Sequence, residues 1–205
     1  DSLALPTAIE HFANVSGSAA NRALYVKDLF VNSQQEVFMH LGYWLRGGSS
    51  GSTYPLDTTS FIIKYNSDLT VNNKIIPVML KNRNYDFPTS LKLFNDKLYL
   101  IGSISDSVIV DNMLFTSDTT TGYKTFAVEF DRNLYSLISK KLPGSFNSFT
   151  VDQNSNIYIS AEYNFPLNID GRLITPTMYA DPDTFYTTDA IIMKLQSDWT
   201  IENYL

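Results

Sequence analysis

The sequence of 205 residues contains no cysteine. This absence excludes disulfides, thiolate zinc sites, iron–sulfur clusters and cysteine nucleophiles. Long hydrophobic runs are missing too, because none approaches the roughly 18 residues of a membrane-spanning helix, and no basic-then-apolar signal peptide opens the chain. Histidine is scarce, with only His11 and His40 in the chain. A histidine-rich metal site or a serine–histidine nucleophile pair is therefore not expected, and the sequence predicts no cofactor and no membrane insertion.

Charge is also sparse, and it is mainly of one sign. Only 18% of residues are charged, and 21 acidic against 15 basic residues leave a net charge of -6. A phosphate backbone would be repelled on average, so a nucleic-acid partner is not expected. What is abundant is apolar surface: 44% of residues are hydrophobic, including 13 Tyr and 13 Phe. The chain can bury a core, and its length fits one domain or a piece of a larger one.

An internal repeat organises the chain. Residues 61–69, 126–134 and 191–199 resemble one another, and Lys64, Glu129 and Lys194 hold the same place in each, 65 residues apart. A second set of apolar segments lies upstream of each, at residues 37–41, 98–102 and 157–161. A polar turn precedes each segment of this second set, and a polar turn also ends each segment of the first set. Each unit is thus predicted to contain a strand, a tight turn, a strand, a long connection, a strand, a tight turn and a strand.

Four short antiparallel strands joined by hairpins are typical of the blade of a β-propeller. The sequence predicts an all-β propeller with three four-stranded antiparallel blades of about 65 residues, at 17–80, 81–143 and 144–205. The middle strands are almost continuously apolar, as expected when blades stack face to face. The fourth strands are more polar, and Lys140 and Lys141 would discourage pairing at an outer edge.

The two ends of the chain share one phase of the repeat. Residues 9–12, Ile-Glu-His-Phe, resemble residues 201–204, Ile-Glu-Asn-Tyr. Residues 1–16 are therefore expected to hold a strand that completes a preceding blade. Propellers close with four to eight blades, and three blades alone would leave two large apolar faces exposed. We expect either further blades in the same polypeptide or a ring completed by self-association.

Several segments together resemble a known family. Residues 151–159, Val-Asp-Gln-Asn-Ser-Asn-Ile-Tyr-Ile, look like its Asp-containing hairpin, and residues 60–66 and 189–195 look like the following strand. Residues 108–114 and 167–173 resemble its small additional hairpin. The pattern is similar to the bacterial seven-bladed-β-propeller-type (SBBP-like) repeat. The resemblance implies secreted or surface proteins that use propellers for binding or display, and it supplies no catalytic residues.

Aromatic residues at the beginning of the long connections are the candidate ligand-binding residues. Tyr43 and Trp44 follow the second strand of the first unit, and Tyr163 and Phe165 follow that strand in the third. Loops at one end of a propeller carry its ligand-binding face, where stacked rings suit a sugar or a protein partner. The alternative is that these rings simply cover the edges of the blades.

One segment has the oxygen-bearing side chains of a metal site and also the residue types of an ordinary turn. Asp152, Asn154 and Asn156 have the alternating oxygen spacing that begins a calcium loop. The glycine and the distant bidentate glutamate of such a loop are missing, and Asx-rich hairpin turns give the same spacing for backbone reasons. The sequence therefore favours a structural turn, with calcium as the alternative.

A glycosidase would need two carboxylates flanking its substrate. Candidates could be drawn from Asp57, Asp86, Asp111, Asp170 and Glu162, but no spacing in the sequence selects a pair. The expected function is therefore non-enzymatic: an extracellular, cell-surface or virion scaffold that binds a protein or glycan, or assembles with other blades. A lectin or a carbohydrate-active hydrolase is the alternative, and a purely structural array of blades is the third.

Overall fold

The computed structural model describes residues 21–46, 58–81, 89–104, 106–118, 124–164, 166–169, 171–176 and 189–205. Within them the chain is all-β, as predicted, with sixteen strands and no helix. The strands are β1 (Asn21–Val31), β2 (Val37–Arg46), β3 (Thr58–Tyr65), β4 (Val71–Lys81), β5 (Thr89–Phe94), β6 (Lys97–Ser103), β7 (Ser107–Val110), β8 (Met113–Thr116), β9 (Thr125–Phe130), β10 (Ser136–Leu142), β11 (Ser145–Val151), β12 (Ile157–Tyr163), β13 (Leu167–Ile169), β14 (Arg172–Ile174), β15 (Asp189–Leu195) and β16 (Ile201–Tyr204).

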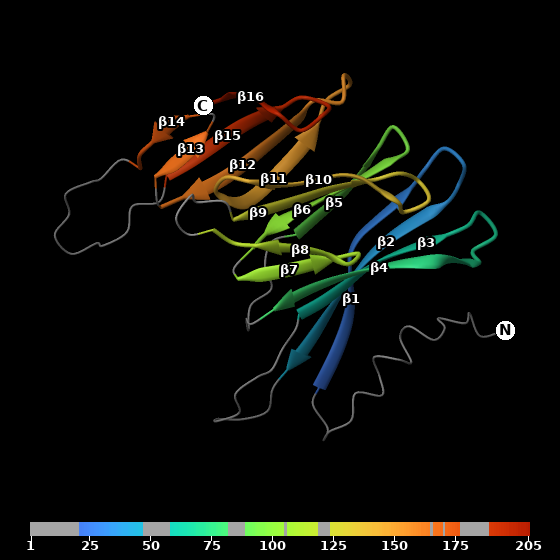
Figure 1. Ribbon diagram of the computed structural model, residues 1–205. Coiled ribbons are helices and arrows are strands. Elements are labelled where there is room, and N and C mark those ends of the chain that lie inside the picture. The colour runs from blue at the N-terminus through green and yellow to red at the C-terminus, as the bar shows by residue number, and fades with distance from the viewer. Residues whose placement is uncertain are drawn as a thin grey trace.

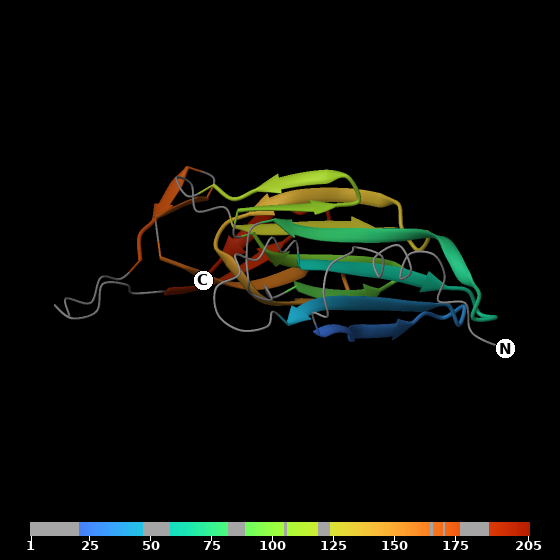
Figure 2. The same cartoon turned by 90° about the horizontal axis from the view of Figure 1, so that it is seen from below.

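The strands form three stacked antiparallel sheets and one separate hairpin (Figure 1). The first sheet has the order β1-β2-β3-β4-β7-β8, the second β10-β9-β6-β5 and the third β11-β12-β15-β16, while β13 pairs with β14. Viewed from below, the first sheet is seen face-on in front of the other sheets, with β1 and β2 at one side of it and β7 and β8 at the other (Figure 2). The described residues do not close into a barrel or a propeller.

Each sheet has one end built of short turns and one end from which long connections leave. The turns join the first strand of a unit to the second and the third to the fourth. The second and third strands are joined by residues 47–57, 104–124 and 164–188, which leave from the opposite end of the stack (Figure 1). Because loops rather than strands tolerate variation, this second end is where the three units differ most in length.

The turns explain why the hairpins form where the repeat predicts them. Five turns share one geometry, in which the fourth turn residue adopts a left-handed φ between 62° and 65°: Gln35, Leu69, Leu134, Ser155 and Trp199. In the turn that follows β9, Oδ1 of Asp131 accepts hydrogen bonds from the backbone N–H groups of Asn133 and Tyr135, at 2.8 Å each. An Asx side chain bonded to its own following backbone stabilises such a turn.

The turn between β5 and β6 is shorter. Asn95 and Asp96 both have positive φ, 48° and 58°, which is the requirement of a two-residue hairpin that matches the strand twist. Asn and Asp tolerate this region better than other non-glycine residues. The second unit therefore makes its first hairpin with two residues where the other units use five.

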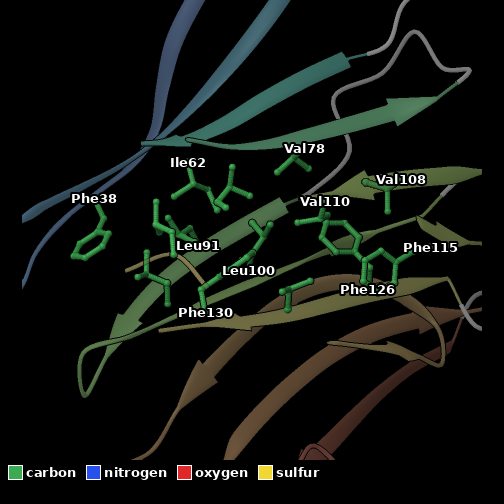
Figure 3. Packing of buried hydrophobic residues seen from close by; sticks show 14 of the residues in the cluster. Phe38, Ile62, Val78, Leu91, Leu100, Val108, Val110, Phe115, Phe126 and Phe130 are labelled. Carbon is green, nitrogen blue, oxygen red and sulfur yellow. The ribbon is translucent and has the colours of Figure 1, made fainter. Parts of the chain in front are cut away.

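The first and second sheets enclose a common hydrophobic core, called core one (Figure 3). Figure 3 shows Phe38, Ile62 and Val78 of the first sheet directed toward side chains of the second sheet. The buried members of core one are Phe38, Ile62, Ile76, Val78, Leu91, Leu98, Leu100, Ile104, Val108, Val110, Phe115, Phe126, Val128, Phe130 and Leu134. Burial of these side chains is the main force that holds the two sheets together.

The second and third sheets enclose core two in the same way. Its buried members are Tyr99, Ile101, Ala127, Leu142, Phe146, Phe149, Ile157, Ile159, Ala161, Leu167, Ile169, Ile191, Met193, Leu195 and Trp199. The second sheet is thus covered on both faces, and every residue of β9 is buried. This agrees with the prediction of continuously apolar middle strands for that unit.

The third sheet does not follow that prediction, because its middle strands alternate between buried and exposed residues. Ile157, Ile159 and Met193 face core two, whereas Glu162 is exposed on the other face and Ile192 is 50% exposed. The expectation of two apolar end faces is therefore wrong for this end of the stack. The physical reason is visible in the period-two alternation of β12, which lets its outer face meet water.

The two small hairpins in the long connections occur as the resemblance implied. β7 pairs with β4, so the hairpin β7–β8 extends the first sheet although its residues belong to the second unit. β4 is therefore not an outer edge along Val78 to Lys81, contrary to the expectation for fourth strands, because β7 supplies its missing partner. The hairpin β13–β14 places Leu167 and Ile169 in core two.

The first strands of the three units lie along one side of the stack, where β5 contacts both β1 and β11. The expected strand in residues 1–16 lies outside the described residues. Nothing in the described part of the chain is a helix long and apolar enough to cross a bilayer.

Candidate functional site

Three of the four predicted aromatic residues lie at the end from which the long connections leave. Tyr43 and Trp44 are near the end of β2, where their backbones pair with Leu24 and Ala23; the structure does not describe their side chains. Tyr163 is the last residue of β12 and holds the position in the repeat that Tyr43 holds in β2. Phe165 lies outside the described residues.

Tyr163 is the one member of this set whose surroundings are described. It is half-buried and packs against core two. Burial, with the negative charge of Asp189, raises the pKa of its phenol above the usual value. Its ring therefore covers part of the core, which corresponds to the alternative that these aromatics protect the sheet edges.

Asp152, the first residue of the calcium candidate, is the centre of a hydrogen-bonded turn. Its Oδ1 accepts from the backbone N–H groups of Asn154 (2.8 Å) and Asn156 (2.9 Å), and its Oδ2 accepts from Asn156 Nδ2 (2.8 Å) and Tyr158 OH (3.3 Å). The bond from the Asn156 side chain, together with these backbone bonds, holds the pKa of Asp152 below its usual value despite an opposing desolvation. Both carboxylate oxygens thus stabilise the turn, and the described residues contain no cluster of three or more metal-ligating His, Asp or Glu side chains.

The carboxylates considered for glycoside hydrolysis are dispersed. Asp111, in the β7–β8 turn, forms an ion pair with Lys74 at 3.1 Å. Glu162 is exposed on β12 and accepts a hydrogen bond from Asn147 at 3.0 Å. These two belong to different sheets, and Asp57, Asp86 and Asp170 lie outside the described residues.

A polar array that the sequence did not reveal crosses three neighbouring strands of the first sheet. His40 of β2 is fully buried, and its Nδ1 lies 3.1 Å from Oδ2 of Asp28 on β1. Its Nε2 lies 3.1 Å from Oγ of Ser60 on β3. Because an ionised aspartate can only accept, Nδ1 is the donor to Asp28; in the tautomer with its proton on Nδ1 alone, Nε2 accepts from the serine hydroxyl.

A β-bulge positions this array. The register between β1 and β2 shifts between Val26 and Asp28, so Lys27 is the additional residue. Bulges re-aim side chains next to an interface. Asp28 accepts a further hydrogen bond from the backbone N–H of Leu91 (3.2 Å), and Lys27 donates to Thr89 Oγ1 (3.1 Å), so both residues connect β1 to β5.

The order Asp28–His40–Ser60 is the hydrogen-bond order of a serine hydrolase triad, in which the aspartate orients the histidine and the histidine activates the serine. Catalysis also requires that a substrate reaches the hydroxyl. His40 is 0% exposed and Ser60 is 6% exposed, and both lie in a sheet that is stacked on another. Asp28 is partly exposed, at 26% of its side chain, so the array is a polar link between β1, β2, β3 and β5 whose histidine and serine are buried.

This interpretation predicts the behaviour of Ser60→Ala. Loss of the hydroxyl leaves Nε2 of buried His40 without its partner, so the free energy of unfolding should fall by about 1–3 kcal/mol. Urea unfolding measures this loss. A serine-directed fluorophosphonate should not label the unmodified protein; stoichiometric labelling at Ser60 would show that the site is open and contradict the interpretation.

Two ion pairs occupy equivalent positions in the first two units, but the acidic and the basic residue are exchanged between them. Lys64 Nζ lies 2.7 Å from Glu36 Oε1, and Lys97 Nζ lies 2.7 Å from Glu129 Oε1. Burial opposes ionisation of Glu36, but its bonds to Lys64 and Asn32 outweigh that effect and hold its pKa below the usual value.

Glu129 also connects the second sheet to the third. It is 2% exposed, and its Oε2 accepts from Nε1 of Trp199 at 3.1 Å. The ring of Trp199 stacks on Tyr99, with centroids 6.2 Å apart and planes inclined by 20°. Burial, and secondly the charge of Glu129, raises the pKa of Tyr99 to about 12.

The raised pKa of Tyr99 predicts alkaline lability. Because the folded state keeps this phenol protonated while the unfolded chain ionises near 10, stability should be unaffected below pH 10 and should fall as the pH rises toward 12. The loss is on the order of 2 kcal/mol for a shift of this size. Urea unfolding of the unmodified protein and of Tyr99→Phe between pH 8 and pH 11.5 measures it. The variant should lose part of the pH dependence, since Tyr65 and Tyr163 also have raised pKa values; identical slopes would contradict the assignment.

A shallow hollow of about 380 Å³ lies at the turn end, between the β1–β2 and β5–β6 turns. Its lining residues are Asn32, Ser33, Leu93, Phe94, Asn95 and Asp96. Asn32 already uses its side-chain oxygen to accept from the backbone N–H groups of Gln34 and Glu36. Four of its six lining residues thus belong to turns, and the side chain of Asn32 is already used to stabilise its own turn.

Comparison with known proteins gives no relative: no family model, no curated protein and no solved structure matches this chain.

Proposed function

We propose that this chain is a segment of a β-propeller of the bacterial seven-bladed type and that it acts as a non-enzymatic scaffold. In this proposal it lies outside the cell or on a virion and presents loops to a protein or glycan partner. Three antiparallel sheets, one of six strands and two of four, are stacked through their faces with their first strands along one side, and this arrangement supports the propeller assignment.

The observation that carries the proposed function is the difference between the two ends of the stack. Short, hydrogen-bonded turns build one end, whereas the connections 47–57, 104–124 and 164–188 all leave from the other. A rigid scaffold that gathers long loops at one end is the usual arrangement of a binding surface. Tyr43 and Tyr163, at equivalent positions of β2 and β12, place aromatic residues at that end.

The placement of the described candidate catalytic groups supports a binding role over catalysis. In the array Asp28–His40–Ser60, the histidine and the serine are buried, and the described candidate carboxylates Asp111 and Glu162 belong to different sheets. A lectin is the second candidate, because aromatic rings at a loop-bearing end suit the apolar faces of sugars.

The test is a binding screen against an array of immobilised surface glycans, with turnover followed in parallel. Trp44→Ala changes the loop-bearing end, and Asn133→Ala changes an exposed residue in a turn at the opposite end. Binding should weaken at least about tenfold in Trp44→Ala and remain unchanged in Asn133→Ala, since a centrally placed aromatic residue carries much of a binding energy. Turnover that one carboxylate substitution abolishes would contradict the non-enzymatic proposal, and equal loss in both variants would contradict the assignment of the binding end.

A further inference from the structure

The hollow at the turn end lies between two turns of unequal length. Figure 1 shows these turns side by side, one in the first sheet and one in the second. The β1–β2 turn consists of residues 32–36, whereas the β5–β6 turn consists of residues 95 and 96 alone. Neighbouring turns of unequal length lack equivalent side chains to fill the space between them. The volume of the hollow, about 380 Å³, falls within the range of about 300–1,000 Å³ that is usual for small-molecule sites.

The apolar part of the hollow is held rigidly. Leu93 and Phe94 are the last residues of β5, and both are partly buried. Leu93 packs against core one and Phe94 packs against core two, so the two interfaces between sheets fix their positions. Asn95 and Asp96 follow in a hairpin whose positive φ values, 48° and 58°, match the twist of the strands. A ligand would therefore lose little affinity to ordering of the site.

Three polar side chains of the lining are available to a ligand. Ser33 and Asn95 are exposed, and Asp96 is half-buried. Within the described residues, none of these three side chains has a hydrogen-bond or ion-pair partner. Asn32 differs, because its Oδ1 accepts from two backbone N–H groups and its Nδ2 donates to Glu36 Oε2 at 2.7 Å. The lining thus offers a ligand one hydroxyl, one amide and one carboxylate.

The charge of the lining limits the class of ligand. Asp96 is the one ionisable residue among the six lining residues, and none of the six is basic. A phosphate or carboxylate ligand would approach this aspartate with no cation in the lining to balance its charge, so an anionic ligand is disfavoured. A carboxylate, an amide and a hydroxyl suit a ligand with several hydroxyl groups, because a hydroxyl both donates and accepts hydrogen bonds.

We propose that the hollow binds a single neutral pyranose ring. The C–H face of the sugar packs on Leu93 and Phe94, and its hydroxyl groups bind the polar side chains of Ser33, Asn95 and Asp96. This site lies at the end opposite the long connections and is independent of the binding surface proposed above. Because a shallow hollow contacts only part of a small ligand, its dissociation constant is expected in the millimolar range.

Backbone amide spectra of the isotope-labelled 205-residue chain, recorded by nuclear magnetic resonance, test the proposal. The probes are the methyl glycosides of D-glucose, D-galactose and D-mannose, each titrated in solution. At least one probe should shift the amide signals of Ser33, Asn95 and Asp96 in a saturable manner. The amide signal of Tyr163, at the loop-bearing end, should not move.

Two aspartate variants locate the site. Asp96→Asn removes the carboxylate but keeps a residue type that tolerates positive φ, so the hairpin should remain folded. The affinity for the sugar should fall at least about fivefold, because hydrogen bonds to a charged group are stronger than those to a neutral one. Asp198→Asn is the matched control, since Asp198 is an exposed turn residue of the third sheet outside the hollow, and this variant should keep the full affinity.

Four results would overturn the proposal. Two of them are the absence of saturable shifts with all three probes and an equal loss of affinity in the two aspartate variants. The third is a set of shifts confined to the loop-bearing end, which would support the lectin alternative there. The fourth is tighter binding of Nα-acetyl-lysine methylamide than of any sugar, abolished by Asp96→Asn, because the hollow would then take a cationic side chain. Trp44→Ala should leave the shifts at the hollow unchanged, so this proposal and the proposed function fail separately.

Discussion

Trp199→Ala is expected to produce the largest loss of stability among single substitutions in the third unit. Trp199 is 1% exposed, and its truncation leaves a cavity in core two, which typically costs about 3–5 kcal/mol. The change also removes the donor to Oε2 of buried Glu129, and a hydrogen bond to a charged group contributes about 1.5–3 kcal/mol. Urea unfolding of the 205-residue chain measures the sum.

Two variants separate these contributions. Trp199→Phe keeps an aromatic ring against Tyr99 and removes only the indole N–H, so its loss should be the smaller one. Leu69→Ala changes the equivalent turn position where the side chain is exposed, and it should shift the free energy of unfolding by no more than about 0.5 kcal/mol. Equal losses for Trp199→Ala and Leu69→Ala in this chain would show that the turn residue does not contribute to the interface.

Lys64→Glu is expected to have the second large effect, because it places a carboxylate beside Glu36 at a site that is 2% exposed. Breaking a buried ion pair in this way costs about 3–5 kcal/mol. The second unit shows that the opposite polarity is also accepted, since Lys97 and Glu129 hold the equivalent positions. The double variant Glu36→Lys/Lys64→Glu should therefore recover more than half of the loss.

A double-mutant cycle in urea measures this recovery as a coupling energy. Some loss should remain in the double variant, because the Glu36 carboxylate also accepts from Asn32 Nδ2 at 2.7 Å and Lys64 lies over the Phe38 ring at 5.7 Å. Additive losses of the two single variants would contradict the equivalence of the two pairs.

The lowered pKa of Glu36 also makes the stability of the unmodified protein depend on pH. The carboxylate of Glu36 stabilises the fold above its unfolded pKa of 4.5, and this contribution is lost as the pH falls through its lower pKa in the folded state.

Much of the strand pattern was accessible from the sequence because hairpins are local. The shared position of Lys64, Glu129 and Lys194 identified the third strands, and the Asx-containing turns identified the hairpins. The alternation in residues 157–162 is a further signal in the sequence, because it distinguishes the polar outer face of the third sheet from the apolar middle strands of the second. The candidate binding residues were less accessible, because aromatic composition alone does not separate a ring that contacts a ligand from one that covers a core, as Tyr163 shows.

The sequence by itself determined the all-β class, the 65-residue period, the turns and the absence of thiol chemistry, because these depend on residue types and short spacings. The tertiary structure alone decided which residues meet across sheets. A bulge at Lys27 brings Asp28 to His40 and to the backbone of Leu91, and sheet stacking brings Trp199 to Glu129, 70 residues away. It also decided that Leu69 is exposed where Leu134 and Trp199 are buried. Identical local turns acquire different environments because burial depends on the neighbouring sheet, and no short-range sequence pattern specifies that neighbour.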